Sequence, residues 1–319
     1  MKYAGNKVVL IGTGAVGVAY AYALVNQGIC EELVLIDINE KKARADVRDL
    51  NHCEAWAPSA VTVTFGDYSD CSTAAMVVIC AGIAQKPGQS RLDLIQTNMG
   101  IFKDIVGKVM NSGFDGIFLV ATNPVDILTY ATWRYSGLPA AQVMGSGTTL
   151  DTARFRFNLA QYFGVATTNV HANIIGEHGD SELPVWSGAV VAGRSMHRLL
   201  EVNPEIKVAL DEIFIQTRDE AYGIIEAKGS TSYGIGMALA RITRAVLRNQ
   251  KITLPISALL QGQYGHRGLY IGVPASVGRQ GVGDIIELDL ETEEQEMFDQ
   301  SVATLKEAQA PFWPDIAPA

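Results

Sequence analysis

The most constraining feature of this sequence is a glycine-rich turn between a strand-like run and a helical run. Residues 7–11 read KVVLI, a β-branched run, and residues 12–17 read GTGAVG. A helical stretch continues to about Gly28, and a second apolar run, ELVLID, ends at Asp37. The order of strand, GxGxxG, helix, strand and acid, with Gly17 and Asp37 20 residues apart, is typical of a dinucleotide-binding βαβ unit.

Each position of the turn has a physical reason. Gly12 permits the tight bend, and Gly14 lets the backbone approach a pyrophosphate at the helix N-terminus, where N–H groups and the helix dipole favour an anion. Gly17 allows the helix to pack closely against the strand. Together with Val16, these glycines form the predicted phosphate-binding loop.

The acid at the end of the second run predicts the cofactor. Asp37 can accept hydrogen bonds from ribose hydroxyl groups, and its charge would repel a 2′-phosphate. The next residues, Ile38 and Asn39, offer no cation to offset that repulsion. The sequence therefore favours NAD over NADP.

Two more apolar runs continue the alternation of strand and helix. Residues 75–82 read AMVVICAG and residues 116–124 read GIFLVATNP. All-apolar strands of this kind are buried on both faces of a parallel sheet, and their carboxyl ends line the ligand crevice. The first half of the chain is thus predicted to be an α/β domain.

Composition excludes several classes of function. The chain has 319 residues, 48% of them hydrophobic, which suffices for one large or two medium domains. Its net charge is −9 and it has no basic tract, so no nucleic-acid partner and no membrane partner is expected. The cysteine spacing supports no metal site, and without a signal-peptide layout a cytoplasmic enzyme is expected.

Residues 174–186, IIGEHGDSELPVW, place His178 between glycines and acids at the end of an apolar run. A polar loop that happens to contain histidine is one interpretation. The other is a proton donor and acceptor, because histidine titrates near neutral pH and a carboxylate can fix its tautomer. Asp151 is 27 residues earlier and could serve as that carboxylate.

Three polar segments could complete such a site. Residues 81–93, AGIAQKPGQSRLD, are either a surface loop or a lid that carries Arg91 to a substrate carbonyl. Asn123, in ATNPVD, is either a turn residue or a ligand of substrate and cofactor. In DTARFR, Asp151 and Arg154 share a helix face, either as a surface ion pair or as a histidine partner beside a carboxylate-binding arginine.

Five motifs taken together resemble the L-lactate/malate dehydrogenase family, and within it the bacterial lactate dehydrogenases. They are GTGAVG, AGIAQKPGQSR, ATNPVD, DTARFR and IIGEHGD, in this order, and the resemblance runs from about Lys7 to Leu305. It implies an α/β fold: a Rossmann dinucleotide-binding domain with a parallel doubly wound sheet over residues 1–145, then a mixed α/β catalytic domain over residues 146–319. It also implies a homotetramer.

The resemblance implies the catalytic roles. His178 would accept and donate the proton, with Asp151 behind it. Arg91 would polarise the substrate oxygen, and Arg154 would bind the substrate carboxylate.

Substrate and cofactor contacts follow from the same resemblance. Asn123 would contact both molecules. In KGSTSYGIG, Thr231 would face the substrate side chain and Ile235 the nicotinamide. Gln85 stands where malate dehydrogenases of the family carry an arginine, so a second substrate carboxylate would be left unpaired. Pyruvate and L-lactate are therefore the expected substrates.

Three alternatives stay open. The substrate could be oxaloacetate or a branched-chain 2-oxoacid, or the chain could be a non-catalytic NAD-binding module. Such a module needs GTGAVG and Asp37 but has no use for His178, Arg91 and Arg154 together.

One further pair is assigned through the resemblance alone. Arg156 and His171 match positions that form a fructose 1,6-bisphosphate site across a subunit interface in bacterial lactate dehydrogenases. The simpler interpretation is a surface ion pair for Arg156 and an ordinary strand residue for His171. The resemblance therefore implies a fructose 1,6-bisphosphate effector.

Overall fold

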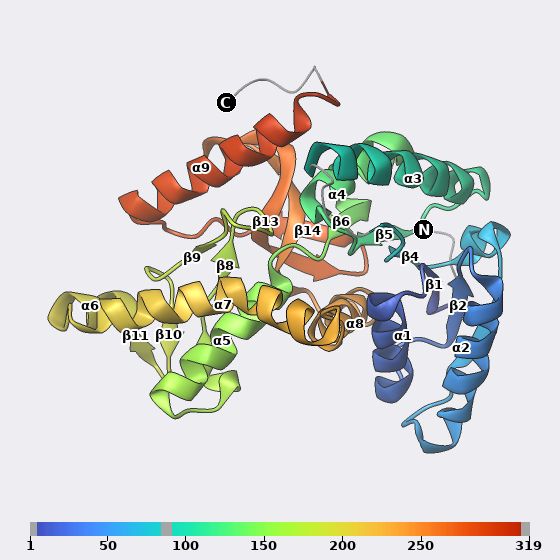
Figure 1. Cartoon of the computed structure of the whole chain (residues 1–319), viewed down its shortest axis with the longest axis horizontal. Coiled ribbons are helices and arrows are strands. Elements are labelled where there is room, and N and C mark those ends of the chain that lie inside the picture. Colours follow the sequence, from blue (N-terminus) through green and yellow to red (C-terminus); the bar gives the residue numbers. More distant parts are fainter. Residues whose placement is uncertain (1–4, 84–90, 314–319) are drawn as a thin grey trace. The chain divides into compact units, whose positions relative to one another are not determined.

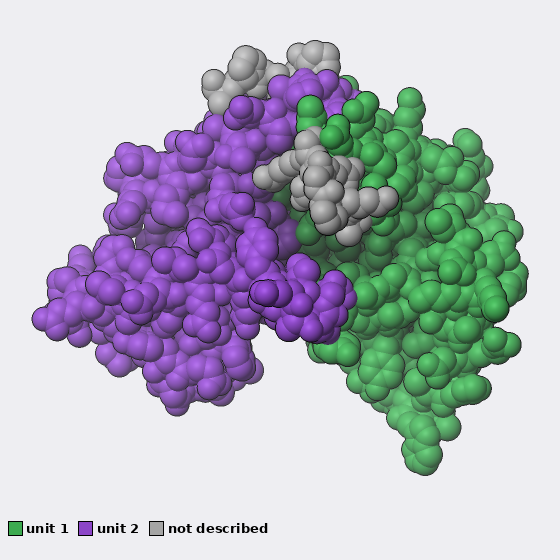
Figure 2. All heavy atoms as spheres, viewed as in Figure 1, with its two compact units in different colours: residues 1–146, 231–252, 276–284 green, residues 147–230, 253–275, 285–319 purple. Residues whose placement is uncertain are grey.

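The computed structural model describes residues 5–83 and 91–313. The chain divides into two compact units, which Figure 2 colours separately. Unit 1 comprises residues 1–146, 231–252 and 276–284, and unit 2 comprises residues 147–230, 253–275 and 285–319. Two later segments of the chain therefore cluster with the N-terminal segment.

A parallel sheet forms the centre of unit 1. Its strands lie in the order β6-β5-β4-β1-β2-β3, and each neighbouring pair among them is parallel. The order reverses direction between β1 and β4, as in a doubly wound sheet, which confirms the predicted fold class. The strands are β1 (Lys7–Ile11), β2 (Glu32–Ile36), β3 (Thr62–Phe65), β4 (Met76–Ile79), β5 (Ile117–Val120) and β6 (Val143–Gly145).

The central strands are apolar because helices cover both faces of this sheet. Every residue of β4 and β5 is buried, as are the last four residues of β1. Figure 1 shows α3 and α4 above these strands and α1 and α2 below them. The helices of unit 1 are α1 (Ala15–Gln27), α2 (Glu40–His52), α3 (Arg91–Asn111), α4 (Val125–Ser136) and α8 (Tyr233–Leu247).

Helix α8 joins unit 1 by packing along α1. Gly236 lies so close to the backbone of Ala19 and Tyr20 that a larger side chain would collide with it. The hydroxyl groups of Tyr20 and Thr243 form a buried hydrogen bond of 2.7 Å. These contacts place Gly236, the last residue of KGSTSYGIG, beside α1.

Unit 2 combines helices with short strands. Its helices are α5 (Thr149–Phe163), α6 (Met196–Val202), α7 (Ile206–Lys228) and α9 (Thr292–Gln309). Its short strands are β7 (Val170–His171), β8 (Ile174–Ile175), β9 (Leu183–Pro184), β10 (Val190–Val191) and β11 (Arg194–Ser195). Three further strands contain residues of both units: β12 (Ile252–Gln261), β13 (Arg267–Gly278) and β14 (Gly281–Ile285).

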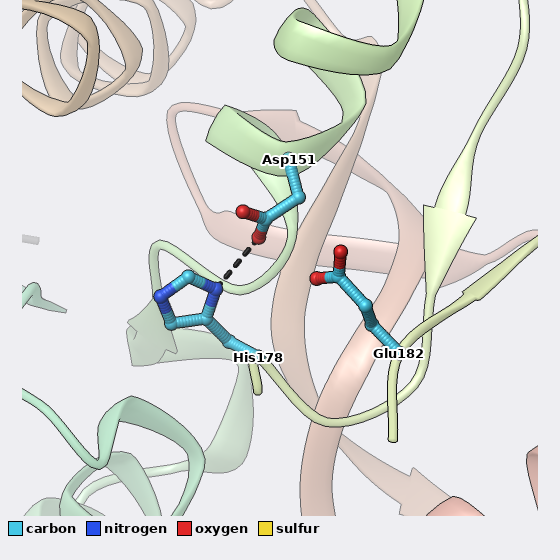
Figure 3. A group of neighbouring side chains, drawn as sticks. All are labelled: Asp151, His178 and Glu182. Atoms are coloured by element: carbon cyan, nitrogen blue, oxygen red, sulfur yellow. Dashed lines mark hydrogen bonds and ion pairs between the residues drawn. The ribbon is translucent and has the colours of Figure 1, made fainter. Parts of the chain in front are cut away.

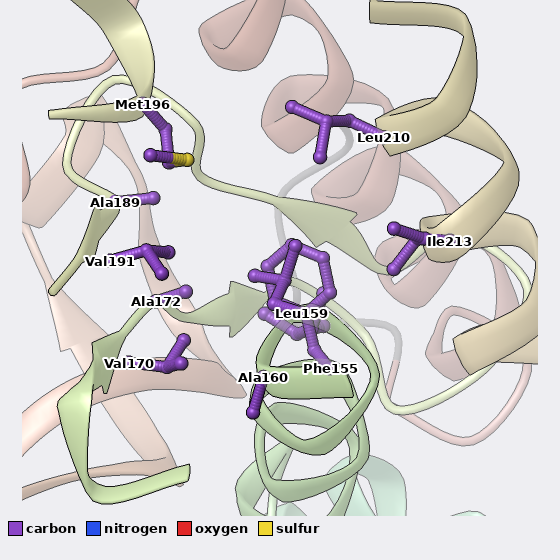
Figure 4. Close-up of a cluster of buried hydrophobic side chains, with 11 residues drawn as sticks. Phe155, Leu159, Ala160, Val170, Ala172, Ala189, Val191, Met196, Leu210 and Ile213 are labelled. Atoms are coloured by element: carbon purple, nitrogen blue, oxygen red, sulfur yellow. The ribbon is translucent and has the colours of Figure 1, made fainter. Parts of the chain in front are cut away.

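The core of unit 2 fixes α5 against the strands that follow it. Phe155 and Leu159 of α5 are fully buried among side chains of β7, β10 and α7, as Figure 4 shows. The ring of Phe155 meets that of Trp186 edge to face, with centroids 5.0 Å apart. Burying a large side chain of this kind contributes about 1.5–3 kcal/mol, so these two side chains stabilise the packing of α5 against its neighbours.

The described helices include no segment with the length and apolar character needed to cross a membrane.

Candidate active site

Helix α5 and strand β8 are tied together at the base of the site. The hydroxyl of Thr148 donates to the carbonyl of Ile174 at 2.7 Å, and the N–H of Ile174 donates to the hydroxyl of Thr152 at 2.9 Å. Both threonines flank Asp151 in the sequence, and His178 follows β8. The two side-chain bonds therefore bring the first turn of α5 beside the loop that carries His178.

The loop itself is braced from the other side. The N–H of Glu177 donates to the hydroxyl of Ser301 in α9 at 2.7 Å. Gly176 forms a two-way backbone bridge with Gly272 and has a φ of 98°, a conformation that favours glycine. These contacts fix the backbone at Gly176 and Glu177, directly before His178.

Asp151 joins His178 and Arg154. Its Oδ2 lies 2.6 Å from Nδ1 of His178, the bond dashed in Figure 3, and its Oδ1 accepts from Nη1 of Arg154 at 3.0 Å. The side chain of Asp151 is 4% exposed, that of Arg154 10% and that of His178 24%. The carboxylate is therefore buried while the imidazole keeps access to solvent.

The electrostatics of Asp151 favour its ionised form. Burial opposes ionisation, but His178 and Arg154 outweigh it and hold the pKa of the carboxyl below its ordinary value. The position of Asp151 in the first turn of α5 also favours an anion. A fixed carboxylate behind Nδ1 leaves Nε2 as the ring nitrogen that can exchange a proton with a substrate.

Glu182 is a second acid at this site, and the sequence did not reveal it. It lies between β8 and β9, and one atom each from Asp151, His178 and Glu182 lie within 4.8 Å of one another (Figure 3). Burial, followed by the charge of Asp151, raises the pKa of Glu182 to about 9. The spacing would suit a metal ion, but both oxygens of Asp151 already accept hydrogen bonds and Arg154 adds a positive charge, so the group fits proton chemistry better.

Unit 1 contains a cleft of about 810 Å³ at the carboxyl ends of its strands. Ligand sites commonly have volumes of roughly 300–1,000 Å³, and open parallel sheets place them at this edge. The lining residues come from the glycine-rich turn, the ends of β2 and β4, and α3; they include Gly12, Gly14, Asp37, Cys80, Gly82 and Lys108.

The glycine-rich turn fits a dinucleotide. Gly12 has a φ of 98° and lies against the backbone of Ala81, so a side chain there would collide. A side chain at Gly17 would collide with the carbonyl of Gly12, whereas Gly14 borders open space at the N-cap of α1. Val16 is half-buried in the first turn of that helix. The open side of the turn thus presents helical N–H groups to the cleft.

Asp37 braces this turn from the end of β2. One of its oxygens accepts from the N–H of Thr13 at 2.6 Å and from the Thr13 hydroxyl at 3.1 Å, and the other accepts from the N–H of Asn39 at 2.8 Å. Burial opposes ionisation of Asp37, but these bonds and the charge of Lys42 lower its pKa. Ile38 and Asn39 offer no cation, as the sequence shows, but Lys42 lies nearby: it reaches the carbonyl of Thr13 at 2.6 Å while paired with Asp46 at 2.7 Å.

The other residues named from the sequence for the substrate and cofactor lie in unit 1. Asn123 is exposed between β5 and α4, and its carbonyl accepts from the side chain of Asn98 at 3.2 Å. Thr231 and Ile235 are partly exposed at the start of α8. Gln85 lies outside the described residues, and so does the side chain of Arg91, which begins α3.

The hydrogen bonds of Arg156 go to residues other than Asp151 and His178. Arg156 is partly buried, and it donates through Nε to the carbonyl of Ala172 at 2.8 Å and through Nη2 to the Asn173 side chain at 3.3 Å. Burial lowers the pKa of its guanidinium. His171 is exposed in β7. Arg156 thus reaches the segment that directly follows His171.

Two family models match the chain. One describes the lactate/malate dehydrogenase NAD-binding domain and matches residues 6–145. The other describes the lactate/malate dehydrogenase α/β C-terminal domain and matches residues 148–312.

Curated relatives match almost the whole chain. An L-lactate dehydrogenase from Corynebacterium glutamicum is 60% identical over 309 residues, covering 97% of this chain and 98% of the relative. One from Macrococcus caseolyticus is 57% identical over 312 residues, covering 98% and 99%. Among solved structures, the minor L-lactate dehydrogenase of Enterococcus mundtii in a ligand-bound form has a TM-score of 0.94 and 47% identity, covering 97% of this chain and 98% of that one.

Proposed function

The chain belongs to the lactate/malate dehydrogenase family, and we propose that it interconverts pyruvate and L-lactate with NAD as its cofactor. The single observation that carries the chemistry is the carboxylate of Asp151, which holds Nδ1 of His178 at 2.6 Å and Nη1 of Arg154 at 3.0 Å. One buried anion thus orients a proton carrier and a carboxylate-binding cation. The relatives named L-lactate dehydrogenase support the choice of reaction.

Arg154, His178 and Asp151 have different proposed roles in the reaction. A guanidinium has several N–H donors, so Arg154 can bind a substrate carboxylate while one donor contacts Asp151. His178 gives a proton from Nε2 to the substrate oxygen during pyruvate reduction and takes it back during lactate oxidation. Asp151 fixes the orientation of the ring and stabilises its charged form.

Unit 1 supplies the cofactor side of the proposal. The turn at Gly12, Gly14 and Gly17 would hold the pyrophosphate, and Asp37 would accept hydrogen bonds from a ribose. When bound there, the nicotinamide cofactor supplies a hydride for C2 of pyruvate. Asn123 and Ile235 are proposed to contact it.

Substrate choice rests on the sequence position of Gln85. A neutral side chain offers no countercharge to the distal carboxylate of oxaloacetate, and leaving such a charge unpaired in a closed site costs several kcal/mol. Gln85 and Thr231 are together proposed to shape a pocket that favours a methyl group. Arg91 is proposed to polarise the substrate carbonyl.

One assay distinguishes this proposal from its alternatives. NADH consumption is measured side by side with pyruvate, oxaloacetate and 2-ketoisocaproate. The proposal expects the highest kcat/KM with pyruvate. A preference for oxaloacetate or 2-ketoisocaproate would replace it with a related 2-hydroxyacid dehydrogenase, and no turnover of any of them would favour a non-catalytic NAD-binding module.

A proposed effector site involves Arg156 and His171. Arg156 and His171 are proposed to contribute to a fructose 1,6-bisphosphate site in a cytoplasmic homotetramer that serves fermentative glycolysis. The contact of Arg156 with Ala172 and Asn173, next to His171, supports the pairing. An arginine grips phosphate bidentately and a protonated histidine adds charge. Activation should appear as a lower pyruvate KM with the effector, strongest at acidic pH.

The regulatory proposal has its own test. His171→Ala and Arg156→Gln should each lose most of the response to fructose 1,6-bisphosphate. Wild-type kinetics that ignore the effector at every pH would contradict it and leave the catalytic proposal untouched.

A further inference from the structure

A buried acid with one enclosed, unpartnered carboxyl oxygen lies beside the proposed proton carrier. Glu182 is 5% exposed and follows His178 by four residues. Its Oε1 is fully enclosed and has no hydrogen-bond partner in the structure, which describes residues 5–83 and 91–313. Figure 3 shows its carboxyl group next to the hydrogen-bonded pair of Asp151 and His178. An ionised carboxylate in that position would lack the hydrogen bonds that a buried charge requires.

The charged neighbours of Glu182 come from three elements. Asp151 and Arg154 lie on α5, His178 lies on the same loop as Glu182, and Arg218 lies on α7. Asp151 already carries the negative charge that pairs with both His178 and Arg154. Arg218 is paired with Asp219 at 2.8 Å. A second negative charge at Glu182 would therefore repel Asp151 and compete for cations that already have partners.

We propose that Glu182 is a positioning residue that stays a neutral acid while His178 gains and loses its proton, so that the charge of Arg154 is left for the substrate carboxylate. The inference rests on the proposed roles of His178 and Arg154. An ionised Glu182 would act as a competing anion inside the site. The proton exchange of the reaction is thereby confined to His178.

The neutral form is the one that the surroundings favour. Burial, and then the nearby charge of Asp151, raise the pKa of Glu182 to about 9. Glu182 therefore holds its proton through the neutral range and releases it in alkaline solution. The form that binds pyruvate has a neutral Glu182, so this form is lost as Glu182 ionises in alkaline solution.

Ionisation of Glu182 predicts a distinctive pH profile. In the wild type, loss of the proton from Glu182 should steepen the alkaline limb of kcat/KM for pyruvate by about tenfold per pH unit above roughly pH 9. Glu182→Gln has no proton to lose at this position, so its alkaline limb should lack this additional steepening. The ratio of kcat/KM in the variant to that in the wild type should then rise by about tenfold per pH unit above roughly pH 9.

A matched control separates this effect from the loss of any buried carboxyl. Glu294 is 7% exposed in the same unit, but its oxygens accept from the N–H and the hydroxyl of Ser187. Glu294→Gln should leave the slope of the alkaline limb as it is in the wild type. Parallel limbs in the wild type and Glu182→Gln, or a steeper limb in the variant, would overturn the inference.

A second measurement does not depend on turnover. Infrared spectra of the wild type carrying isotope-labelled glutamate should show a protonated carboxylic acid at neutral pH that disappears above about pH 9. Its absence from Glu182→Gln assigns it. A spectrum with no protonated glutamate at neutral pH overturns the inference alone, since the proposed reaction is judged separately by the substrate assay.

Discussion

Replacing Asp151 with asparagine removes one negative charge and preserves the shape of the side chain. In the wild type the carboxylate of Asp151 accepts a hydrogen bond from Nδ1 of His178 at 2.6 Å and another from Nη1 of Arg154 at 3.0 Å. The amide can still contact the imidazole, but it no longer stabilises the protonated ring. The variant should therefore bind NADH normally and reduce pyruvate slowly.

The magnitude follows from the kind of bond that is lost. A hydrogen bond to a charged group contributes about 1.5–3 kcal/mol. Because about 1.4 kcal/mol corresponds to a factor of ten, kcat/KM for pyruvate should fall by about 10- to 150-fold. Burial of Asp151, whose side chain is 4% exposed, places the loss toward the upper end.

The assay is steady-state NADH oxidation with pyruvate at several pH values. Asp211→Asn serves as the control, because Asp211 forms an exposed pair with Lys207 at 3.0 Å in the same unit. Such surface pairs contribute about 0–1 kcal/mol, and the control should keep its kcat/KM within about twofold. A decrease of less than about twofold in Asp151→Asn as well would refute the role given to this carboxylate.

Three further predictions concern substrate, cofactor and stability. Gln85→Arg should raise the ratio of kcat/KM for oxaloacetate to that for pyruvate, because it supplies the missing countercharge; an unchanged ratio would show that Gln85 does not face the substrate. Asp37→Asn should weaken NADH binding and narrow the preference for NADH over NADPH in paired titrations, and equal affinities in variant and wild type would contradict the ribose contact. Glu182 has a pKa raised to about 9 in the folded chain, against about 4.3 when unfolded, so its contribution to stability is complete below the lower value and is lost as the pH rises to the upper one. The free energy of unfolding, measured with denaturant, should rise in Glu182→Gln relative to the wild type by up to about 1.4 kcal/mol per pH unit across that window. If the free energies of the two proteins change in parallel with pH, the raised pKa of Glu182 is excluded.

The fold of unit 1 was predictable because its signals are local. The apolar runs ending near Ile11, Ile36, Ile79 and Val120 became the buried parallel strands, since helices on both faces bury nearly every position along them. The edge strand β3 (Thr62–Phe65) was not predicted. It has only 4 residues and is half exposed, so its sequence, TVTF, lacks the continuous apolar character of the others.

The site was predictable only in part. Asp151 and His178 could be named from their sequence motifs, but their contact depends on Thr148 and Thr152 bonding to β8, which no local pattern reveals. Glu182 follows Ser181 in a polar loop, and its burial arises from packing against other elements.

The contact of Lys42 with the glycine-rich turn was not predicted either, because it joins residues far apart in the sequence. Lys42 lies five residues beyond Asp37, on α2, and returns through space to the carbonyl of Thr13. The residues next to Asp37 in the sequence give no sign of this contact. The roles assigned to Arg91, Asn123, Thr231 and Ile235 stay predictions.

His178 is proposed to carry the proton of a reversible pyruvate reduction, and His178→Ala tests this role most directly. NADH binding is measured by fluorescence titration and pyruvate reduction by NADH oxidation, on the same preparation of the variant. The variant should bind NADH with an affinity close to that of the wild type and lose nearly all turnover. Near-normal pyruvate reduction by His178→Ala would contradict it.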